Sequence, residues 1–179
     1  DDPQAHTNLG VALQEFGKLP EAEASYRTAL TLKPDDAGVH TNLGTVLQDL
    51  GYLEEAEKHC RESIRLEPDL AEAHNNLGKL LRDLGRFNEA ETSYRQAIKL
   101  QPDFADAHFN LGTLLRDLGK LEEAELSTRK AIELKPDHVN AYSNLGYVLR
   151  DLGKLEEALL CSKKIMSLRS WSITGSYSF

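Results

Sequence analysis

The stretch His74–Gly85, HNNLGKLLRDLG, decides the fold because its pattern recurs at a fixed interval along the chain. The element Asn-Leu-Gly that begins at Asn76 returns every 34 residues, at Asn8, Asn42, Asn110 and Asn144. The glycine that ends the stretch returns at the same interval, at Gly17, Gly51, Gly119 and Gly153. A shared interval of this kind indicates an array of similar supersecondary units that stack on one another.

Proline marks the end of each of the first four units, at Pro34, Pro68, Pro102 and Pro136. The predicted units are residues 3–36, 37–70, 71–104, 105–138 and 139–172, with 173–179 as a C-terminal tail. The first four units each carry a glutamate and an arginine four residues apart, such as Glu23 and Arg27, which are predicted to pair on one helix. The fifth unit is degenerate, because it lacks both this pair and the closing proline.

Inside each unit the apolar residues follow a helical period in two segments. In the third unit, Leu77 and Leu81 belong to one stripe, and Ala90 and Tyr94 belong to a second. Gly85 lies between the stripes, where its tolerance of positive φ suits the end of a helix. Each unit is therefore predicted to be a pair of helices joined by a tight turn.

The residues that close a unit also predict how the next helix begins. Proline stops one helix, and the aspartate after it, such as Asp69 or Asp103, is expected to cap the next. Glu72 stands three residues after Asp69, which is the spacing of a capping box.

Composition and charge exclude several classes of function. Of the 179 residues, 40% are hydrophobic and 28% are charged, and the net charge is -8. Nucleic acids and anionic membranes favour basic surfaces, so neither is an expected partner. No apolar run reaches the roughly 18 residues needed to span a bilayer. The two cysteines, Cys60 and Cys161, lie in distant units, which favours a reducing compartment, and a cytoplasmic location is predicted.

No motif for catalysis, phosphate binding or cofactor binding occurs in the sequence, so the chain is predicted not to be an enzyme. The histidine series suggests a metal site, but helices of successive units lie about 8–10 Å apart, whereas zinc ligands lie about 2 Å from the metal. We therefore expect no metal and no cofactor. The series is interpreted as packing between units, at His6, His40, His74 and His108.

The residues Leu77-Gly78, Leu81, Ala90, Tyr94 and Pro102 carry a resemblance to the tetratricopeptide repeat, which covers about residues 3–172. The resemblance implies an all-α fold, a right-handed superhelical α-solenoid of antiparallel helix hairpins. It also implies that first helices line a concave wall and second helices a convex one. One departure concerns an aromatic position of the second helix, where the side chain becomes smaller towards the end of the chain: Tyr26, Cys60, Tyr94, Thr128 and Ser162. This change predicts thinner packing in the later units.

Under this resemblance the repeated asparagines face the concave groove. One carboxamide can satisfy both the N–H and the C=O of an extended peptide. A peptide-binding row is therefore predicted at Asn8, Asn42, Asn76, Asn110 and Asn144. The row is similar to the asparagine ladder in the repeat domain of O-linked N-acetylglucosamine transferases. The alternative is that each asparagine bonds a neighbouring helix or water.

Charged and aromatic residues extend the predicted groove. Three arginines at one repeat position are candidates to bind acidic ligand groups, because a guanidinium contacts a carboxylate in bidentate fashion. The alternative is that each arginine is neutralised by an aspartate of an adjacent unit. The added candidates for peptide binding are Lys79, Arg82, Arg116, Arg150, Phe109 and Tyr147.

The last helix has an apolar surface where a polar capping helix is usual. Leu159 and Leu160 stand where the fourth unit has Glu125 and Leu126. Three alternatives follow for this end: the tail folds back over the helix, the tail is disordered, or a second copy docks there and forms a homodimer through the C-terminal helix.

The expected function is that of a protein–protein interaction scaffold, which binds a peptide or partner protein in its concave groove. The first alternative is a substrate-presenting fragment of a larger glycosyltransferase-type or sulfotransferase-type enzyme, since similar repeats precede such domains. The second alternative is a scaffold that associates with itself.

Overall fold

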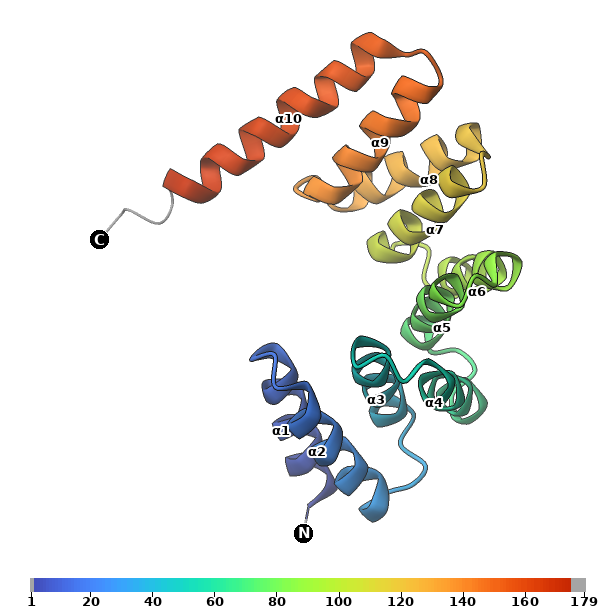
Figure 1. Cartoon of the computed structure of the whole chain (residues 1–179), viewed down its shortest axis with the longest axis vertical. Coiled ribbons are helices and arrows are strands. Elements are labelled where there is room, and N and C mark those ends of the chain that lie inside the picture. Colours follow the sequence, from blue (N-terminus) through green and yellow to red (C-terminus); the bar gives the residue numbers. More distant parts are fainter. Residues whose placement is uncertain (1, 175–179) are drawn as a thin grey trace. The chain divides into compact units, whose positions relative to one another are not determined.

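The structure is a computed structural model that describes residues 2–174, and the side chains of residues 2–169. All regular structure in this part of the chain is helical, in ten helices that follow one another as hairpins (Figure 1). The helices are α1 Pro3–Glu15, α2 Leu19–Leu32, α3 Ala37–Asp49, α4 Leu53–Leu66, α5 Ala71–Asp83, α6 Phe87–Leu100, α7 Ala105–Asp117, α8 Leu121–Leu134, α9 Val139–Asp151 and α10 Leu155–Thr174.

The chain forms two compact bodies, and from here on the word unit refers to these, while the 34-residue units of the sequence are called repeats. The first unit is Asp1–Leu100 with α1 to α6, and the second is Gln101–Phe179 with α7 to α10. Within each unit, every odd-numbered helix packs against the even-numbered helix that follows it. The all-α fold of helix hairpins agrees with the sequence prediction. The predicted tail, residues 173–179, lies mostly outside the described residues, because only its first two residues belong to α10.

The tight turn inside each hairpin depends on a glycine with positive φ. Gly85 has φ 74°, and the N–H of Arg86 donates to the carbonyl of Leu81 at 2.8 Å, which closes the end of α5. A residue with a Cβ is strained in this left-handed conformation. The glycines at the same position in the other hairpins have φ between 72° and 85°.

The prediction that the aspartate after each proline caps the next helix is wrong at all four junctions, where the N-cap residues are Asp36, Leu70, Phe104 and His138. At α3 the cap is the second aspartate after Pro34: Asp36 accepts a hydrogen bond from the N–H of Val39 at 3.2 Å, while Asp35 lies in the turn. At α5 and α7 the N-cap residues are Leu70 and Phe104, and neither side chain makes a cap bond. The Pro-Asp pair forms the preceding turn there, so Asp69 and Asp103 lie one position outside the helix and cannot complete a capping box.

The first helix of a hairpin contacts the second through a glycine. A Cβ at Gly78 would lie 2.6 Å from the ring of Tyr94, which is fully buried. This contact shows that the small residue leaves room for a ring on the second helix. At Gly146 a Cβ would meet nothing closer than 3.6 Å. The predicted thinning of the packing is therefore confirmed in the fifth repeat, but it is wrong for the fourth, where a Cβ at Gly112 would collide with the fully buried Thr128.

The repeated histidines have a more specific role than the predicted packing. His74 Nε2 lies 2.9 Å from the carbonyl oxygen of Pro68, and His108 Nε2 lies 2.9 Å from that of Pro102. A carbonyl only accepts, so the ring nitrogen donates in each pair. Each histidine therefore ties the first turn of its helix to the proline turn that precedes it.

Ion pairs join consecutive second helices within each unit. Arg27 of α2 contacts Glu23 at 2.9 Å on its own helix and Glu55 of α4 at 2.8 Å. In the second unit, Arg129 of α8 contacts Glu125 at 2.9 Å and Glu157 of α10 at 2.5 Å. The pairs that the sequence predicted within single helices are thus shared with the next repeat.

Candidate peptide-binding faces

The asparagines of the first unit differ in exposure. Asn8 is exposed and accepts a hydrogen bond from Gln4 Nε2 at 2.9 Å, whereas Asn42 is half-buried. Asn76 is buried, and its amide donates to the hydroxyl of Thr45 on α3 at 3.1 Å. The carboxamide of Asn76 therefore links two consecutive first helices.

In the second unit, Asn144 on α9 is only 4% exposed. Its oxygen accepts from Arg116 Nη1 at 2.6 Å, and its amide donates to the hydroxyl of Thr128 at 3.1 Å. Both partners belong to the preceding repeat. Asn76 and Asn144 thus show the helix-bridging geometry of the alternative interpretation, although a carboxamide keeps capacity for further bonds. Asn110 at the same position on α7 is half-buried.

The most developed surface feature of the second unit is an aromatic ring between two guanidinium groups. Tyr147 is 51% exposed, and its ring centroid lies 5.8 Å from Arg116 Cζ and 5.4 Å from Arg150 Cζ. These distances fit cation–π contacts. The cluster presents a flat apolar ring and cationic hydrogen-bond donors at one place.

The aspartate that contacts each arginine is the one that follows it in the chain. Arg116 Nη2 lies 2.9 Å from Asp117 Oδ1, and Arg150 Nη2 lies 3.2 Å from Asp151 Oδ1. The alternative that an aspartate of an adjacent repeat neutralises each arginine is wrong for Arg116 and Arg150. In both cases the aspartate that contacts the guanidinium is the next residue in the chain. Arg82 contacts Asp83 in the same way at 3.8 Å.

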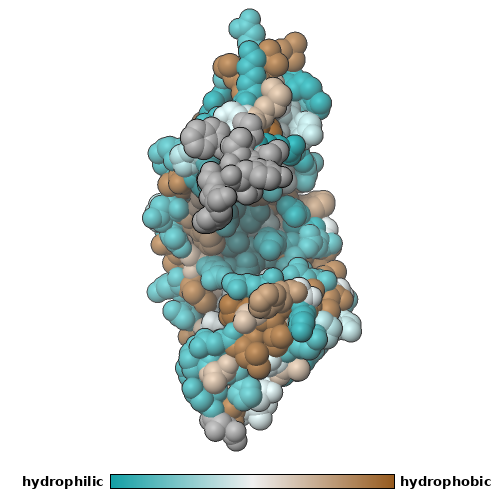
Figure 2. All heavy atoms as spheres, turned by 90° about the vertical axis from the view of Figure 1, so that its left-hand side faces the viewer, coloured by the Kyte–Doolittle hydropathy of each residue, from teal (hydrophilic) through white to brown (hydrophobic). Residues whose placement is uncertain are grey.

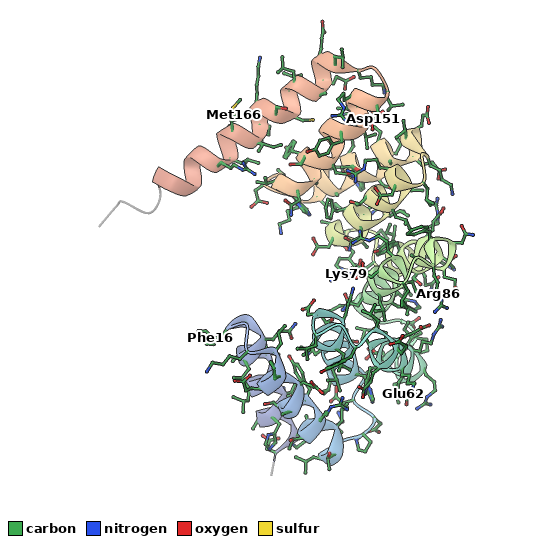
Figure 3. All side chains as sticks on the ribbon, viewed as in Figure 1. Phe16, Glu62, Lys79, Arg86, Asp151 and Met166 are labelled. Carbon is green, nitrogen blue, oxygen red and sulfur yellow. The ribbon has the colours of Figure 1, made fainter. Side chains whose placement is uncertain are left out.

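Two other predicted binding residues are Phe109 in the second unit and Lys79 in the first. Phe109 is half-buried, and its ring packs against His138 with 4.7 Å between centroids. Lys79 on α5 is half-buried, and Figure 3 shows it and Arg86 pointing to opposite sides of the α5–α6 pair. Lys79 and Arg82 thus belong to the first unit, and the candidates Phe109, Arg116, Tyr147 and Arg150 belong to the second.

A hollow of ≈ 370 Å³ lies beside the aromatic cluster, between α9 and α10. Tyr147 and Arg150 line it from α9, and Leu155, Leu159 and Ile165 line it from α10. Sequence analysis did not assign these α10 residues to a binding site. Its one signal was the leucine at position 159, where the fourth repeat has a glutamate.

A second feature that the sequence did not indicate is a histidine pair in a hollow of ≈ 690 Å³. His40 Nδ1 lies 2.8 Å from His59 Nδ1, and His40 Nε2 lies 3.0 Å from the carbonyl oxygen of Pro34. His40 must donate to the carbonyl, so in the neutral pair its Nδ1 accepts from His59. Burial lowers the pKa of His59, and the charge of His40 lowers that pKa further.

Neither cysteine has the environment of a reactive nucleophile. Both are buried and unpaired, and burial raises the pKa of Cys60 to about 12. Burial also raises the pKa of Cys161. A thiol with a raised pKa holds little of the reactive thiolate at neutral pH. Among the described side chains, residues 2–169, there is no group of three or more His, Cys, Asp and Glu arranged to hold a metal ion.

The repeat sequence matches known family models along most of the chain. Models described as TPR repeat or tetratricopeptide repeat match residues 15–51, 37–70, 59–92, 78–115, 105–138 and 128–159. These segments overlap and leave no gap from residue 15 to residue 159. The chain belongs to the tetratricopeptide repeat family.

Solved structures show the same fold at low sequence identity. PilF of Pseudomonas aeruginosa is 22% identical, with a TM-score of 0.86 over 92% of this chain and 75% of that one. A thermophilic TPR protein of Thermus thermophilus, TTC0263, is 23% identical, with a TM-score of 0.79 over 96% and 97%. YrrB, described as a TPR protein with an unusual peptide-binding site, is 24% identical, with a TM-score of 0.69 over 92% and 85%. No curated protein matches the chain.

Two findings concern membranes and nucleic acids as partners of this tetratricopeptide repeat chain. No helix within the described residues combines the length and apolar character needed to cross a membrane. The net charge of -8 opposes binding to polyanions.

Proposed function

We propose that this chain is a scaffold that binds an extended segment of a partner protein, and that the second unit anchors the segment at Tyr147. The supporting observation is the exposed Tyr147 ring between Arg116 and Arg150. Tyrosine and arginine are enriched among residues that dominate binding energy. The description of YrrB as a peptide-binding TPR protein is consistent with this use of the fold.

The proposed segment carries a carboxylate next to an apolar side chain. Each guanidinium contacts a half-exposed aspartate, and a ligand carboxylate can replace that contact because the pairs are open to solvent. The apolar side chain enters the adjacent hollow, whose α10 wall includes Leu155 and Leu159. The Tyr147 ring, the two guanidinium groups and the hollow would together favour a segment with this pair of side chains.

The repeated asparagines have two proposed roles. We place the contacts to the peptide backbone at Asn8, Asn42 and Asn110, which are exposed or half-buried, with Phe109 beside Asn110. Asn76 and Asn144 support the face through their bonds to the preceding repeat and use their spare capacity towards the ligand. In the first unit, Lys79 and Arg82 supply the charge.

The test begins with random peptides displayed on phage and selected against the intact chain. Affinities of the selected peptides are then measured by calorimetry for the wild type and for the Tyr147→Ala, Arg150→Ala and Asn110→Ala variants. Tyr147→Ala should weaken binding at least about tenfold, as removal of a dominant contact does. Leu126→Ala is the matched control, because Leu126 is 71% exposed on α8 and lines neither the cation–π cluster nor the hollow.

Two results refute the proposal. One is a selection that enriches no peptide. The other is a set of selected peptides that bind Tyr147→Ala and Arg150→Ala as tightly as the wild type. Salt should also weaken binding of acidic peptides, because exposed charge contacts are screened within about 10 Å at 0.1 M ionic strength.

The same proposal has the chain acting by contact alone, without catalysis, in the cytoplasm. The two unpaired cysteines support a reducing compartment. A substrate-presenting fragment of a larger enzyme would use the same peptide face, so the experiment above applies to it as well.

Self-association is a second candidate function, and a specific observation favours it. Leu155, Leu159, Leu160 and Met166 of α10 are all more than half exposed, so the C-terminal helix presents an apolar surface. Exposed patches of this kind mark interaction sites. We propose that a second copy covers this surface, and a concentration-dependent mass in solution would support that proposal.

A further inference from the structure

The first repeat exposes positions that other repeats bury. Leu9 is 50% exposed, whereas Leu43 and Leu145 at the same repeat position are 0% and 4% exposed. Phe16 is 82% exposed at the tip of the first hairpin. Figure 3 shows Phe16 pointing away from the helices, and Figure 2 shows apolar side chains gathered over α1 and α2.

The fifth repeat exposes complementary positions. Met166 is 64% exposed, although Ile132 at the same position of the fourth repeat is half-buried. Ser162 is exposed, whereas Cys60 and Thr128 at its position are 2% and 0% exposed. Figure 3 shows Met166 pointing outward from α10. The fifth repeat therefore exposes the same surface of its second helix that the fourth repeat packs against the repeat after it.

The junction between the fourth and fifth repeats shows what covers such a surface. Ile132 of α8 packs against the cluster that contains Leu145 and Leu149 of α9. The next repeat therefore fills the apolar face with two leucines of its first helix.

Polar contacts fix the register of the same junction. Asn144 bonds to Thr128 and to Arg116, both in the preceding repeat. Arg129 pairs with Glu157 across the second helices at 2.5 Å. These three contacts, with the apolar packing, define the geometry of one repeat stacked on the next.

We propose that the N-terminal face of a second copy stacks on the C-terminal face of the first and continues the array head to tail. In this stack the first repeat of the second copy packs on the fifth repeat of the first copy, as the fifth repeat packs on the fourth within one chain. Leu9 and Leu13 of the second copy then take the places of Leu145 and Leu149, and they contact Met166 of the first copy, which takes the place of Ile132. Asn8 of the second copy then takes the place of Asn144, and it meets Ser162 and Arg150. Glu21 of the second copy meets Lys163, which has the repeat position of Arg129. The chain thus carries both halves of a junction that it already uses internally.

This inference rests on the self-association proposed above and specifies its partner surface. A head-to-tail contact is heterologous, so it leaves one free face at each end and grows into chains or closed rings. A symmetric dimer through α10 would stop at two copies and would not need α1. The two arrangements therefore differ in stoichiometry and in the residues that they require.

The experiment uses two blocked variants of the full chain. Leu9→Asp places a charge on the N-terminal face, and Met166→Asp places one on the C-terminal face. Both side chains are at least half exposed, so each variant should keep its helices, which circular dichroism checks. Each blocked variant alone should be at least about tenfold weaker in self-association than the wild type. The 1:1 mixture should recover a heterodimer, because each variant keeps one intact face.

A third variant separates the two arrangements further. Leu159→Glu restores the residue type of Glu57 and Glu125, which contact Arg86 and Lys154 of the following repeat at 2.7 Å. In the head-to-tail stack this glutamate faces Lys18 of the second copy, so association should persist or strengthen by a few-fold. In an apolar dimer through α10, the same charge would break the contact.

Sedimentation velocity at several concentrations reads out every variant, with Leu126→Asp as the control for an exposed leucine elsewhere. Restored association in the mixture supports the stack. A wild type that stays monomeric at all concentrations overturns both self-association and the stack. A dimer that survives Leu9→Asp and is lost with Leu159→Glu overturns the stack alone, and leaves the symmetric dimer in its place.

Discussion

The contact between the two helices of a hairpin makes a graded prediction for three glycines at one repeat position. A Cβ at Gly78 would lie 2.6 Å from the Tyr94 ring, one at Gly44 would lie 2.9 Å from the sulfur of Cys60, and one at Gly146 would lie 3.6 Å from its nearest neighbour. All three glycines lie inside helices. The substitution to alanine therefore adds the same methyl group to three different spaces.

Two opposing terms set the magnitude. Alanine is favoured over glycine inside a helix by about 0.5–1 kcal/mol. Forcing a methyl into a filled core costs about 1–3 kcal/mol. The ring of Tyr94 is fully buried and cannot swing into solvent, so Gly78→Ala should lower the free energy of unfolding by about 1–2 kcal/mol. Gly146→Ala meets only an ordinary contact and should raise it by about 0.5–1 kcal/mol.

Urea unfolding followed by circular dichroism at 222 nm measures the three variants against the wild type. Gly44→Ala should fall between the other two, because a single sulfur atom yields more easily than a ring. An array can unfold repeat by repeat, so the comparison uses the transition of the repeat concerned, identified by amide hydrogen exchange. If Gly146→Ala destabilises as much as Gly78→Ala, or the order is reversed, the steric account of this glycine is wrong.

Three further predictions follow from the contacts described above. Asn144→Ala should lower the free energy of unfolding by about 1–3 kcal/mol, because it leaves buried polar partners unpaired, whereas Asn8→Ala at the exposed position should stay within about 0.5 kcal/mol in the same urea assay. Burial lowers the pKa of His59 in the folded state, so the stability that the neutral ring contributes is fully present above the ordinary histidine pKa and is lost as pH falls towards the lowered pKa. The variant His59→Gln should therefore lose less stability than the wild type when thermal unfolding is measured at decreasing pH. An identical loss in both proteins would contradict a lowered pKa for His59. Native Cys60 should react with a thiol reagent only at the rate of local opening, since it is buried with a pKa raised to about 12, and fast labelling of the folded chain would count against this environment.

Local patterns determined a large part of the fold from the sequence. The apolar period identified the two helices of each repeat, and the repeated glycines identified the turns, because positive φ is a property of the residue itself. Gly85 and its four equivalents have this conformation in the structure. The Glu–Arg pairs within a helix, such as Glu125 with Arg129, also depend only on spacing along one helix.

The sequence did not determine where side chains at the junctions find their partners. Asp69 has the right residue type and spacing to cap a helix, but α5 begins at Ala71 and leaves it in the turn. His59 carried no sequence signal, because its partner His40 lies on the other helix of the hairpin. These outcomes depend on how one helix is rotated against the next, which no single segment encodes.

The asparagine row shows the same division. Its interval, fixed by the sequence alone, indicated one carboxamide at the same place on each first helix. Only the tertiary structure decided that Asn144 is buried and joined to Arg116 and Thr128, while Asn8 at the first repeat is exposed. The physical reason is that each repeat is buried by the repeats packed against it, so identical positions acquire different environments when the side chains of their neighbours differ.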